Sequence, residues 1–270
     1  AATAAAGFIL ERLRAASPAA GGTSFATPMV ARSLDGRLLH RYRDGQASIP
    51  AFLDDYAFLA LGLLDLYEAA FEVRWLSEGK RLTQEMTRLF WDERAGGFFL
   101  SGAHNERLIA QTKALYDGAL PSGNSVAALL LMRLGTLTQD QELRRYAERQ
   151  LQAFSGQVTQ APHAFPQFLI AVDFWLGPSK EIVIAGDPAA ADTRAMVRAV
   201  HGRFLPRAVL ALRPADVSSA QVEALIPFLK AQRPLQGAAT AYVCEHYICN
   251  LPTTDLATLT ALLGEADAVQ

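Results

Sequence analysis

The segment AFLDDYAFLALGLLDLYEAAF, residues 51–71, is apolar almost all the way round, yet it carries Asp54, Asp55 and Tyr56 in its first two turns. A helix of this character is expected to be an inner, buried helix. An ionised carboxylate is costly inside a core unless it is paired, hydrogen-bonded or turned toward a wet cavity, so polar residues grouped at the start of such a helix indicate a site. A structural interpretation stays open, in which Asp54 caps the helix and Asp55 joins a buried polar network.

Apolar periodicity predicts further helices on both sides of this segment, near residues 1–16, 73–90, 122–135, 139–157 and 161–176. The helices that follow the long loops 17–50 and 91–121 are the more apolar ones, whereas 139–157 is polar on one side. This alternation indicates inner and outer layers of paired helices. We therefore predict a mainly α fold, part of an (α/α) helical-hairpin toroid, in which all inner helices begin at the same rim.

The pattern changes after Pro178. KEIVIAG and RAVLAL are typical of buried strands, 190–204 and 219–230 are typical of helices, and ATAYVCEHYIC predicts one or two more strands. The sequence thus predicts two domains, the helical toroid part at 1–177 and a small α/β lobe at 178–270. The turn AGDP after the first strand has neither of the glycine-rich phosphate-binding patterns, so nucleotide binding is not expected there.

Composition excludes several classes of protein. The 270 residues are 51% hydrophobic and 19% charged, with a formal net charge of -2, so no basic face favours nucleic acid or an anionic membrane. No apolar run reaches the length of a membrane span, and we expect a soluble protein. The first sixteen residues read as an amphipathic helix rather than a signal peptide, which suggests that the chain begins inside a longer one.

The cysteine content points to a reducing compartment. Only Cys244 and Cys249 are present, in CEHYIC, which is too few for a disulfide-built secreted scaffold. We expect two thiols on a strand pair, in a cytoplasmic protein. Cys244, His246 and Cys249 have a non-standard spacing for zinc and lack a second cluster, so neither a metal site nor any other cofactor is predicted.

Because all inner helices are expected to begin at the same rim, the sequence predicts a pocket there. It would gather polar groups from three parts of the chain: Asp54, Asp55 and Tyr56; Asp117, Ser122, Asn124 and Ser125; and His163. Convergence of polar groups from distant positions is what a ligand pocket requires. Trp91 and Phe98 add flat apolar faces of the kind that suit sugar rings. The alternative is that Trp91 and GGFF form a small β-hairpin packed on the outer rim.

Structural interpretations of the other rim residues also stay open. Ser122 is placed to cap the helix that follows it. A buried Asn124 bonded to a loop carbonyl would explain that residue without a ligand. Lys113, which could bind a substrate, can equally pair with Asp117 across one turn.

Four stretches carry a family resemblance: LDDYAFLALGLLDLYEAAFEVRWL, WDERAGGFFL, KALYDGALPSGNSVAALLLMRL and AATAYVCEHYICNLPT. They resemble the C-terminal part of the YyaL-type, spermatogenesis-associated family. Its members join a thioredoxin-like domain to a six-hairpin, glycosidase-like helical toroid related to N-acylglucosamine 2-epimerases. The resemblance implies that fold and a thioredoxin-like partner domain, but no established activity. This chain contains no CxxC, and it supplies about half of a twelve-helix ring, so a second copy could complete the ring as a homodimer.

Two enzymatic functions and one non-enzymatic function follow as hypotheses. Glycoside hydrolysis needs two carboxyl groups roughly 5 to 10 Å apart, for which Asp55 and Asp117 are the candidates, with Asp54 as a substitute. Sugar epimerisation needs a base beside a carbonyl, and His163 with Lys113 could supply it. The alternative is a non-catalytic scaffold that binds another protein or a thioredoxin-like domain.

Overall fold

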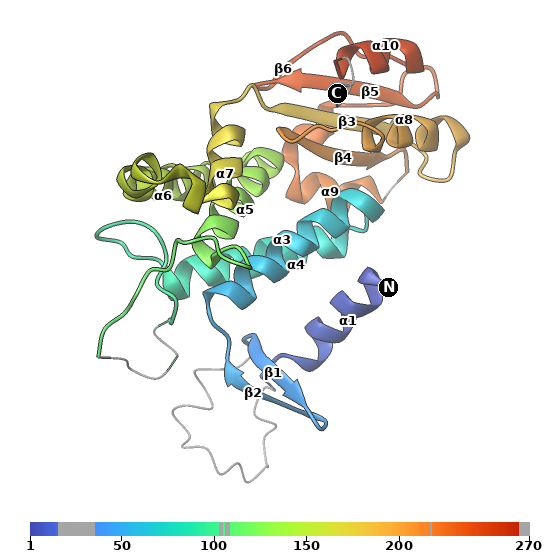
Figure 1. The fold of residues 1–270 in the computed structure, drawn as a ribbon. Helices are drawn as coiled ribbons and strands as arrows, with labels where there is room; N and C mark the ends of the chain where they lie inside the picture. Colours follow the sequence, from blue (N-terminus) through green and yellow to red (C-terminus); the bar gives the residue numbers. More distant parts are fainter. Residues whose placement is uncertain (16–35, 103–104, 106–108, 217, 265–270) are drawn as a thin grey trace.

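The computed structural model describes residues 1–15, 36–102, 105, 109–216 and 218–264 (Figure 1). Helices make up most of the described chain, and a small sheet lies at one side of them. The prediction of a mainly α fold with a C-terminal α/β lobe is therefore confirmed at this level.

Two helical hairpins and a fifth helix form the central part. These are α3 (Leu53–Ala70) with α4 (Val73–Phe90), α5 (Gly123–Thr138) with α6 (Gln141–Gln160), and α7 (Pro166–Leu176), which follows the 3₁₀ turn η1 (Pro162–Ala164). Helix α5 packs against α3, α6 and α7, while α4 packs on α3. The predicted layering is present, with α3, α5 and α7 side by side. Closure of this array into a ring stays a prediction.

Burial follows the layering but corrects one expectation. Helix α5 is buried along almost its whole length, because neighbours cover it on every side. Helix α3 was predicted to be buried all round, yet Phe58 is 40% exposed and Gly62 and Asp65 are also exposed. The reason is that α3 has neighbours on only part of its surface. Its remaining face is turned toward α1.

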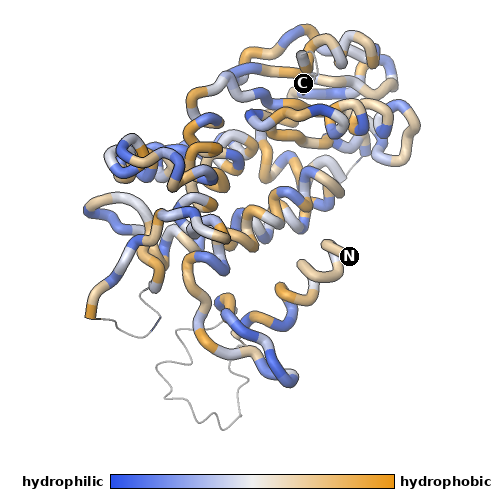
Figure 2. Tube along the Cα trace, viewed as in Figure 1, coloured by the Kyte–Doolittle hydropathy of each residue, from blue (hydrophilic) through white to orange (hydrophobic). Residues whose placement is uncertain are grey.

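The N-terminal part contains a hairpin that the sequence interpretation missed. Helix α1 (Ala2–Arg12) is followed, beyond the residues that are not described, by the antiparallel strands β1 (Leu39–Arg43) and β2 (Gln46–Pro50). Both turn residues, Asp44 and Gly45, have positive φ. The pair Asp-Gly is a strong hairpin signal, and it lies in the segment 17–50 that was predicted as a long loop. Strand β1 is largely hydrophilic (Figure 2).

The C-terminal lobe is a four-stranded sheet in the order β4-β3-β5-β6. Its strands are β3 (Lys180–Gly186), β4 (Ala208–Pro214), β5 (Thr240–Glu245) and β6 (Ile248–Cys249). Strands β3 and β4 are parallel and are joined through α8 (Ala191–His201), as expected for a crossover, while β5 and β6 run antiparallel to their neighbours. The remaining elements are α9 (Ser219–Leu225), the 3₁₀ turn η2 (Pro227–Ala231) and α10 (Leu256–Leu262).

Each face of this sheet belongs to a different core. Ile182, Ile184 and Leu210 pack with α8 and α10 on one face. On the other face, Val183 and Val209 join the core of the central helices. The lobe is therefore built onto the helical array. The predicted domain boundary between 177 and 178 coincides with the passage from α7 to β3 and stays a prediction.

The expectation of two free thiols is wrong for this structure. Cys244 on β5 and Cys249 on β6 are joined by a disulfide. The two residues stand directly opposite each other in the strand register, which brings their sulfur atoms together. The predicted strand pair itself is present. Across the described ranges, no helix has both the length and the apolar character needed to cross a bilayer.

An ion cluster lies where α3 meets α5 and the sheet, with Arg133 and Glu68 largely buried and Asp65 exposed. Arg133 on α5 pairs with Asp65 at 2.6 Å and with Glu68 at 3.2 Å, both on α3. Burial raises the pKa of Glu68 to about 7, although the charge of Arg133 opposes this shift. Because the folded protein then binds this proton more tightly than the unfolded chain, the stabilisation is full below about pH 4.5 and is lost as the pH rises toward 7.

We expect Glu68→Gln to remove this part of the pH dependence. The free energy of unfolding, measured by urea titration, should fall less between pH 5 and pH 8 in the variant than in the parent protein. The difference should be about 2 to 3 kcal/mol. Glu148→Gln, on an exposed position of α6, is the matched control and should leave the pH profile unchanged. The same pH profile in both variants would contradict the attribution of this pH dependence to Glu68.

Candidate functional site

The starts of α3, α5 and α7 meet at one end of the helical array, as the sequence predicts. Asp54, in the first turn of α3, lies so close to α5 that a Cβ atom on Gly123 would collide with its carboxylate. Asp117 connects the start of α5 with the start of α7. The close approach of the two helices thus leaves little room for a side chain at position 123.

Asp117 has a structural role at this junction. It is 8% exposed. One carboxylate oxygen accepts a hydrogen bond from the Ser122 amide at 2.9 Å, and the other accepts from the amides of Gln167 at 2.9 Å and Phe168 at 3.3 Å. These amides belong to first helical turns, which have no partners within their own helices. The predicted catalytic role of Asp117 is not supported, because its oxygens are occupied by the backbone.

The polar residues at the start of α5 also bind the protein itself. Ser122 caps α5 by accepting from the amide of Ser125, and its hydroxyl donates to the carbonyl of Leu115. Ser125 is fully buried beside it and bonds the same carbonyl. The structural interpretation of Ser122 is thus confirmed, and neither serine faces a cavity that could hold a substrate.

Asn124 clamps the loop that precedes α5. Its side chain is fully buried and accepts a hydrogen bond from the Phe98 amide at 2.9 Å. Its amide group donates to the carbonyls of Phe98 and Ala114 at 2.9 and 2.8 Å. A buried asparagine bonded to loop carbonyls was the alternative interpretation, and the structure agrees with it. No hydrogen-bonding capacity of Asn124 is left over for a sugar.

The aromatic residues expected to hold a sugar ring are packed inside the protein. Trp91 and Phe98 form an antiparallel bridge, with ring centroids 4.9 Å apart, and Tyr146 covers the other side of Trp91 at 4.8 Å. This is the small hairpin of the alternative interpretation. Lys113 pairs with Asp92 at 2.6 Å instead of Asp117, and its hydrogen bond lowers the pKa of Asp92.

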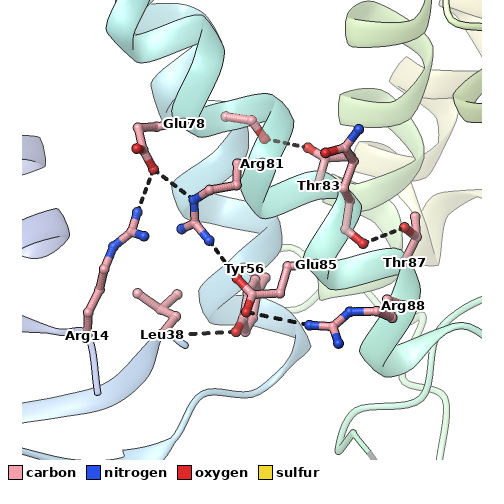
Figure 3. Close-up of polar contacts among 11 residues, drawn as sticks. Arg14, Leu38, Tyr56, Glu78, Arg81, Thr83, Glu85, Thr87 and Arg88 are labelled. Carbon is pink, nitrogen blue, oxygen red and sulfur yellow. Dashed lines mark hydrogen bonds and ion pairs between the residues drawn. The ribbon is translucent and has the colours of Figure 1, made fainter. Parts of the chain in front are cut away.

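Tyr56 is also a core residue. It is completely buried, its hydroxyl accepts a hydrogen bond from the Leu38 amide, and burial raises its pKa to about 12. Figure 3 shows Tyr56 beside a chain of ion pairs that runs from Arg14 through Glu78 and Arg81 to Glu85. Tyr56 thus attaches the segment before β1 to α3. It is not available to a ligand.

His163 stands apart from the other predicted site residues. It is exposed in η1, and no hydrogen bond or ion pair joins its ring to any residue that the structure describes. Asp117 contacts this turn through its backbone amide, which donates to the carbonyl of Ala164. A pair of His163 and Lys113 is therefore not assembled.

Asp54 and Asp55 line a groove of about 680 Å³ between α1, β1 and α3. Helix α1 lies alongside α3 at this place (Figure 1). The walls are mostly aliphatic and aromatic, and the polar groups are His40, Asp54 and Asp55. A mostly apolar pocket with a few convergent polar groups is the usual form of a small-molecule site. We call this cavity, with its apolar walls and with His40, Asp54 and Asp55, the α1–α3 groove.

Asp55 and His40 form a hydrogen-bonded pair in the groove. The distance from His40 Nδ1 to Asp55 Oδ2 is 2.8 Å, and the same oxygen accepts a hydrogen bond from the Phe52 amide at 2.8 Å. The His40 ring also meets the Phe52 ring edge to face, at 5.4 Å. The helix start thus orients the carboxylate, and the carboxylate orients the imidazole. An imidazole held through Nδ1 keeps Nε2 for proton transfer.

Asp54 differs from Asp55 in its environment. Partial burial raises the pKa of Asp54, the charge of Asp55 adds to this effect, and a hydrogen bond from the Gly123 backbone opposes it. A carboxyl group with a raised pKa beside a second acidic side chain is a common basis for acid/base chemistry. Asp54 and Asp55 are the two predicted site residues that the structure leaves in a cavity.

The sequence interpretation missed His40 as a site residue. His40 lies 15 residues before Asp55, on β1, and only the hairpin carries it back to the start of α3. The Asp-Gly turn at 44–45 was the signal that could have revealed this hairpin. Within the described ranges, no group of three or more His, Cys, Asp or Glu residues could hold a metal ion, and the two cysteines of the considered zinc set form a disulfide.

We expect Asp117→Ala to lower the free energy of unfolding by about 2 to 4 kcal/mol, because three amides lose a charged acceptor in a buried place. Glu148→Ala, on the exposed face of α6, should change it by less than about 0.5 kcal/mol. Urea denaturation followed by circular dichroism measures both values. Equal stability of the two variants would refute the structural role of Asp117.

Comparison with known proteins gives homologues for nearly the whole chain. It is 38% identical over 266 residues to human spermatogenesis-associated protein 20, which covers 95% of this chain and 34% of the human protein. The mouse protein of the same name is 40% identical over 215 residues, 79% of this chain and 27% of that protein. An uncharacterized protein of Caenorhabditis elegans is 27% identical over 225 residues, 82% of this chain and 30% of that protein. No family model matches the chain.

These matches agree with the resemblance noted in the sequence, but they do not bear on the ring or the glycosidase-like character. This chain spans about a third of the length of the curated relatives it matches. The human and mouse homologues are named spermatogenesis-associated protein 20, which is consistent with the family that the sequence resembles.

Proposed function

We propose that the chain binds a sugar-type ligand in the α1–α3 groove, with the His40–Asp55 pair as its polar anchor. The observation that carries the proposal is the placement of this oriented pair, together with Asp54, in a cavity of about 680 Å³. Asp117, Ser122, Asn124 and Ser125 are engaged within the protein, so the groove is the place where the predicted carboxylates Asp54 and Asp55 can meet a ligand.

The chemistry of the groove fits a ligand with both hydroxyl and apolar groups. Carboxylate oxygens accept hydrogen bonds from hydroxyls, and the imidazole can donate or accept. The aliphatic walls, with Phe58 exposed on α3, offer surface for C–H faces or for an apolar substituent. A small sugar that carries an acyl group combines these features.

Two reactions are compatible with these groups. Glycosidase-like hydrolysis would use Asp54, whose raised pKa favours the protonated form, as the acid, and Asp55 as the base or nucleophile. Epimerase-like proton abstraction would instead use His40 as the base, oriented by Asp55. In the hydrolytic reaction, Asp54 thus takes the place that the sequence analysis gave to Asp117, because the Asp117 oxygens accept hydrogen bonds from backbone amides.

We expect amino sugars or acylated sugars to raise the melting temperature of the chain, since a ligand that binds only the folded state stabilises it. His40→Gln and Asp55→Asn should abolish the shift while the proteins stay folded, because asparagine still accepts the Phe52 hydrogen bond. His163→Gln, on the exposed η1 turn, is the control and should keep the shift. A shift that survives in Asp55→Asn would exclude this groove.

A scaffold function is the second candidate, and a different surface favours it. Helix α7 exposes four large apolar residues: Leu169, Ile170, Trp175 and Leu176. A second cavity, of about 620 Å³, runs between α6 and α7 beside Trp175. Exposed apolar patches of this kind mark interaction surfaces. A second copy of the chain or a thioredoxin-like domain, as the family resemblance implies, would cover it.

We expect the chain to form a dimer at micromolar concentration through this α7 surface. The double variant Ile170→Glu and Trp175→Glu should be monomeric in light scattering after gel filtration, because two buried charges would oppose association. Ile49→Glu, on an exposed residue of β2 outside the α7 surface, is the matched control and should leave the mass unchanged. A monomeric parent chain would favour a different partner over self-association.

A further inference from the structure

The β5–β6 hairpin carries a disulfide whose two halves differ in accessibility. Cys244 on β5 is 2% exposed, whereas Cys249 on β6 is an exposed residue. The surrounding segment is exposed as well, with Ile248 79% exposed and Leu251 90% exposed. One residue of the disulfide is therefore buried in the lobe, and the other is exposed.

The hairpin turn reaches from the sheet to the helical array. The Tyr247 amide donates to the buried carboxylate of Glu181 at 2.9 Å. The Tyr247 hydroxyl donates to the carbonyl of Thr136 at the end of α5 and accepts from Arg144 of α6, both at 3.2 Å. Tyr247 is thus a contact through which the lobe and the α5–α6 hairpin are joined.

The turn conformation depends on constraint from its flanking strands. His246 and Tyr247 both have positive φ, of 51° and 63°, although neither is glycine. L-residues with a side chain adopt this conformation at a cost in free energy. Strand β6 contributes only two residues to the sheet, so the disulfide is the strongest connection that holds the hairpin closed.

We propose that Cys244–Cys249 is a thiol–disulfide exchange site whose co-substrate is a dithiol. A thiolate of the dithiol attacks Sγ of Cys249, the Cys244–Cys249 bond breaks, and Cys244 leaves as a thiolate. The second thiolate of the dithiol then attacks the first dithiol sulfur, which is bonded to Cys249 in the mixed disulfide. The bond to Cys249 breaks, and Cys249 is released as a thiolate. The chain gains two electrons and two protons as two thiols, and the dithiol is oxidised to a disulfide.

Accessibility selects the attacked sulfur. In-line attack needs an open approach, which Cys249 provides and Cys244 does not. Opening of the bond frees the turn at His246 and Tyr247 to relax, and the contacts of Tyr247 with α5 and α6 weaken as a result. The redox state of this pair thereby sets how firmly the hairpin holds the lobe to the helices.

The first experiment treats the native chain, purified without reductant, with dithiothreitol and follows the thiols by alkylation and mass spectrometry. We expect the bond to open while circular dichroism stays native, at a rate proportional to dithiol concentration. Glutathione should give a mixed disulfide on Cys249. Opening only when the protein unfolds, attack on Cys244, or two free thiols before treatment would each overturn the proposal.

Single variants separate exchange from a purely structural link. Cys244→Ser leaves the exposed thiol of Cys249, and Cys249→Ser leaves the buried thiol of Cys244. We expect Cys249 to react with an aromatic disulfide reagent roughly tenfold faster or more, because access controls such rates. Equal rates in two folded variants would contradict the proposal.

Hydrogen exchange tests the consequence for the turn. Reduction should speed the exchange of the Tyr247 amide, and the exchange should slow again after reoxidation. Tyr247→Phe keeps the disulfide but loses the hydroxyl contacts with α5 and α6, so it should show faster exchange at the end of α5 without reductant. An unchanged Tyr247 amide after complete reduction would show that the bond does not control this contact.

Discussion

The carboxylate of Asp117 joins the starts of α5 and α7, and the packing of the inner helices depends on this contact. Helix starts carry backbone amides without intrahelical partners, which is costly in a place that water does not reach. Asp117 supplies acceptors for three such amides in two helices, and Ser122 and Asn124 supply acceptors for further amides. Inner helices that begin together therefore need a set of inward polar side chains for structural reasons alone.

This requirement changes how the polar rim of such a fold is interpreted. Aspartate, serine and asparagine at the starts of apolar helices resemble a ligand site in the sequence, because the same groups recognise sugars. Most of them here satisfy the backbone, and the neighbouring aromatic residues Trp91 and Phe98 pack against each other. Asp54 and Asp55 also accept hydrogen bonds from backbone amides, but they additionally line a groove that α1 and β1 form with α3.

The contact between the helices and the sheet lobe has a different character. It combines a continuous apolar core with a few polar links, among them Arg133 with Glu68 and the Tyr247 turn with α5 and α6. Apolar packing fixes the lobe in place without directional preference. The polar links respond to proton or thiol concentration. Conditions that leave the apolar core intact can therefore still alter the contact between the helices and the lobe.

The sequence by itself determined most of the secondary structure, but not the β1–β2 hairpin. Apolar periodicity located the helices at 51–71, 73–90 and 122–135, and the strand KEIVIAG, because these patterns depend on neighbouring residues. Only the tertiary structure decided which polar residues face a cavity. Asp117 and Asp55 look alike in sequence, and what separates them is the partner brought by distant chain: backbone amides of α7 for one, and His40 for the other. Such partners are set by packing between segments, which local patterns do not encode.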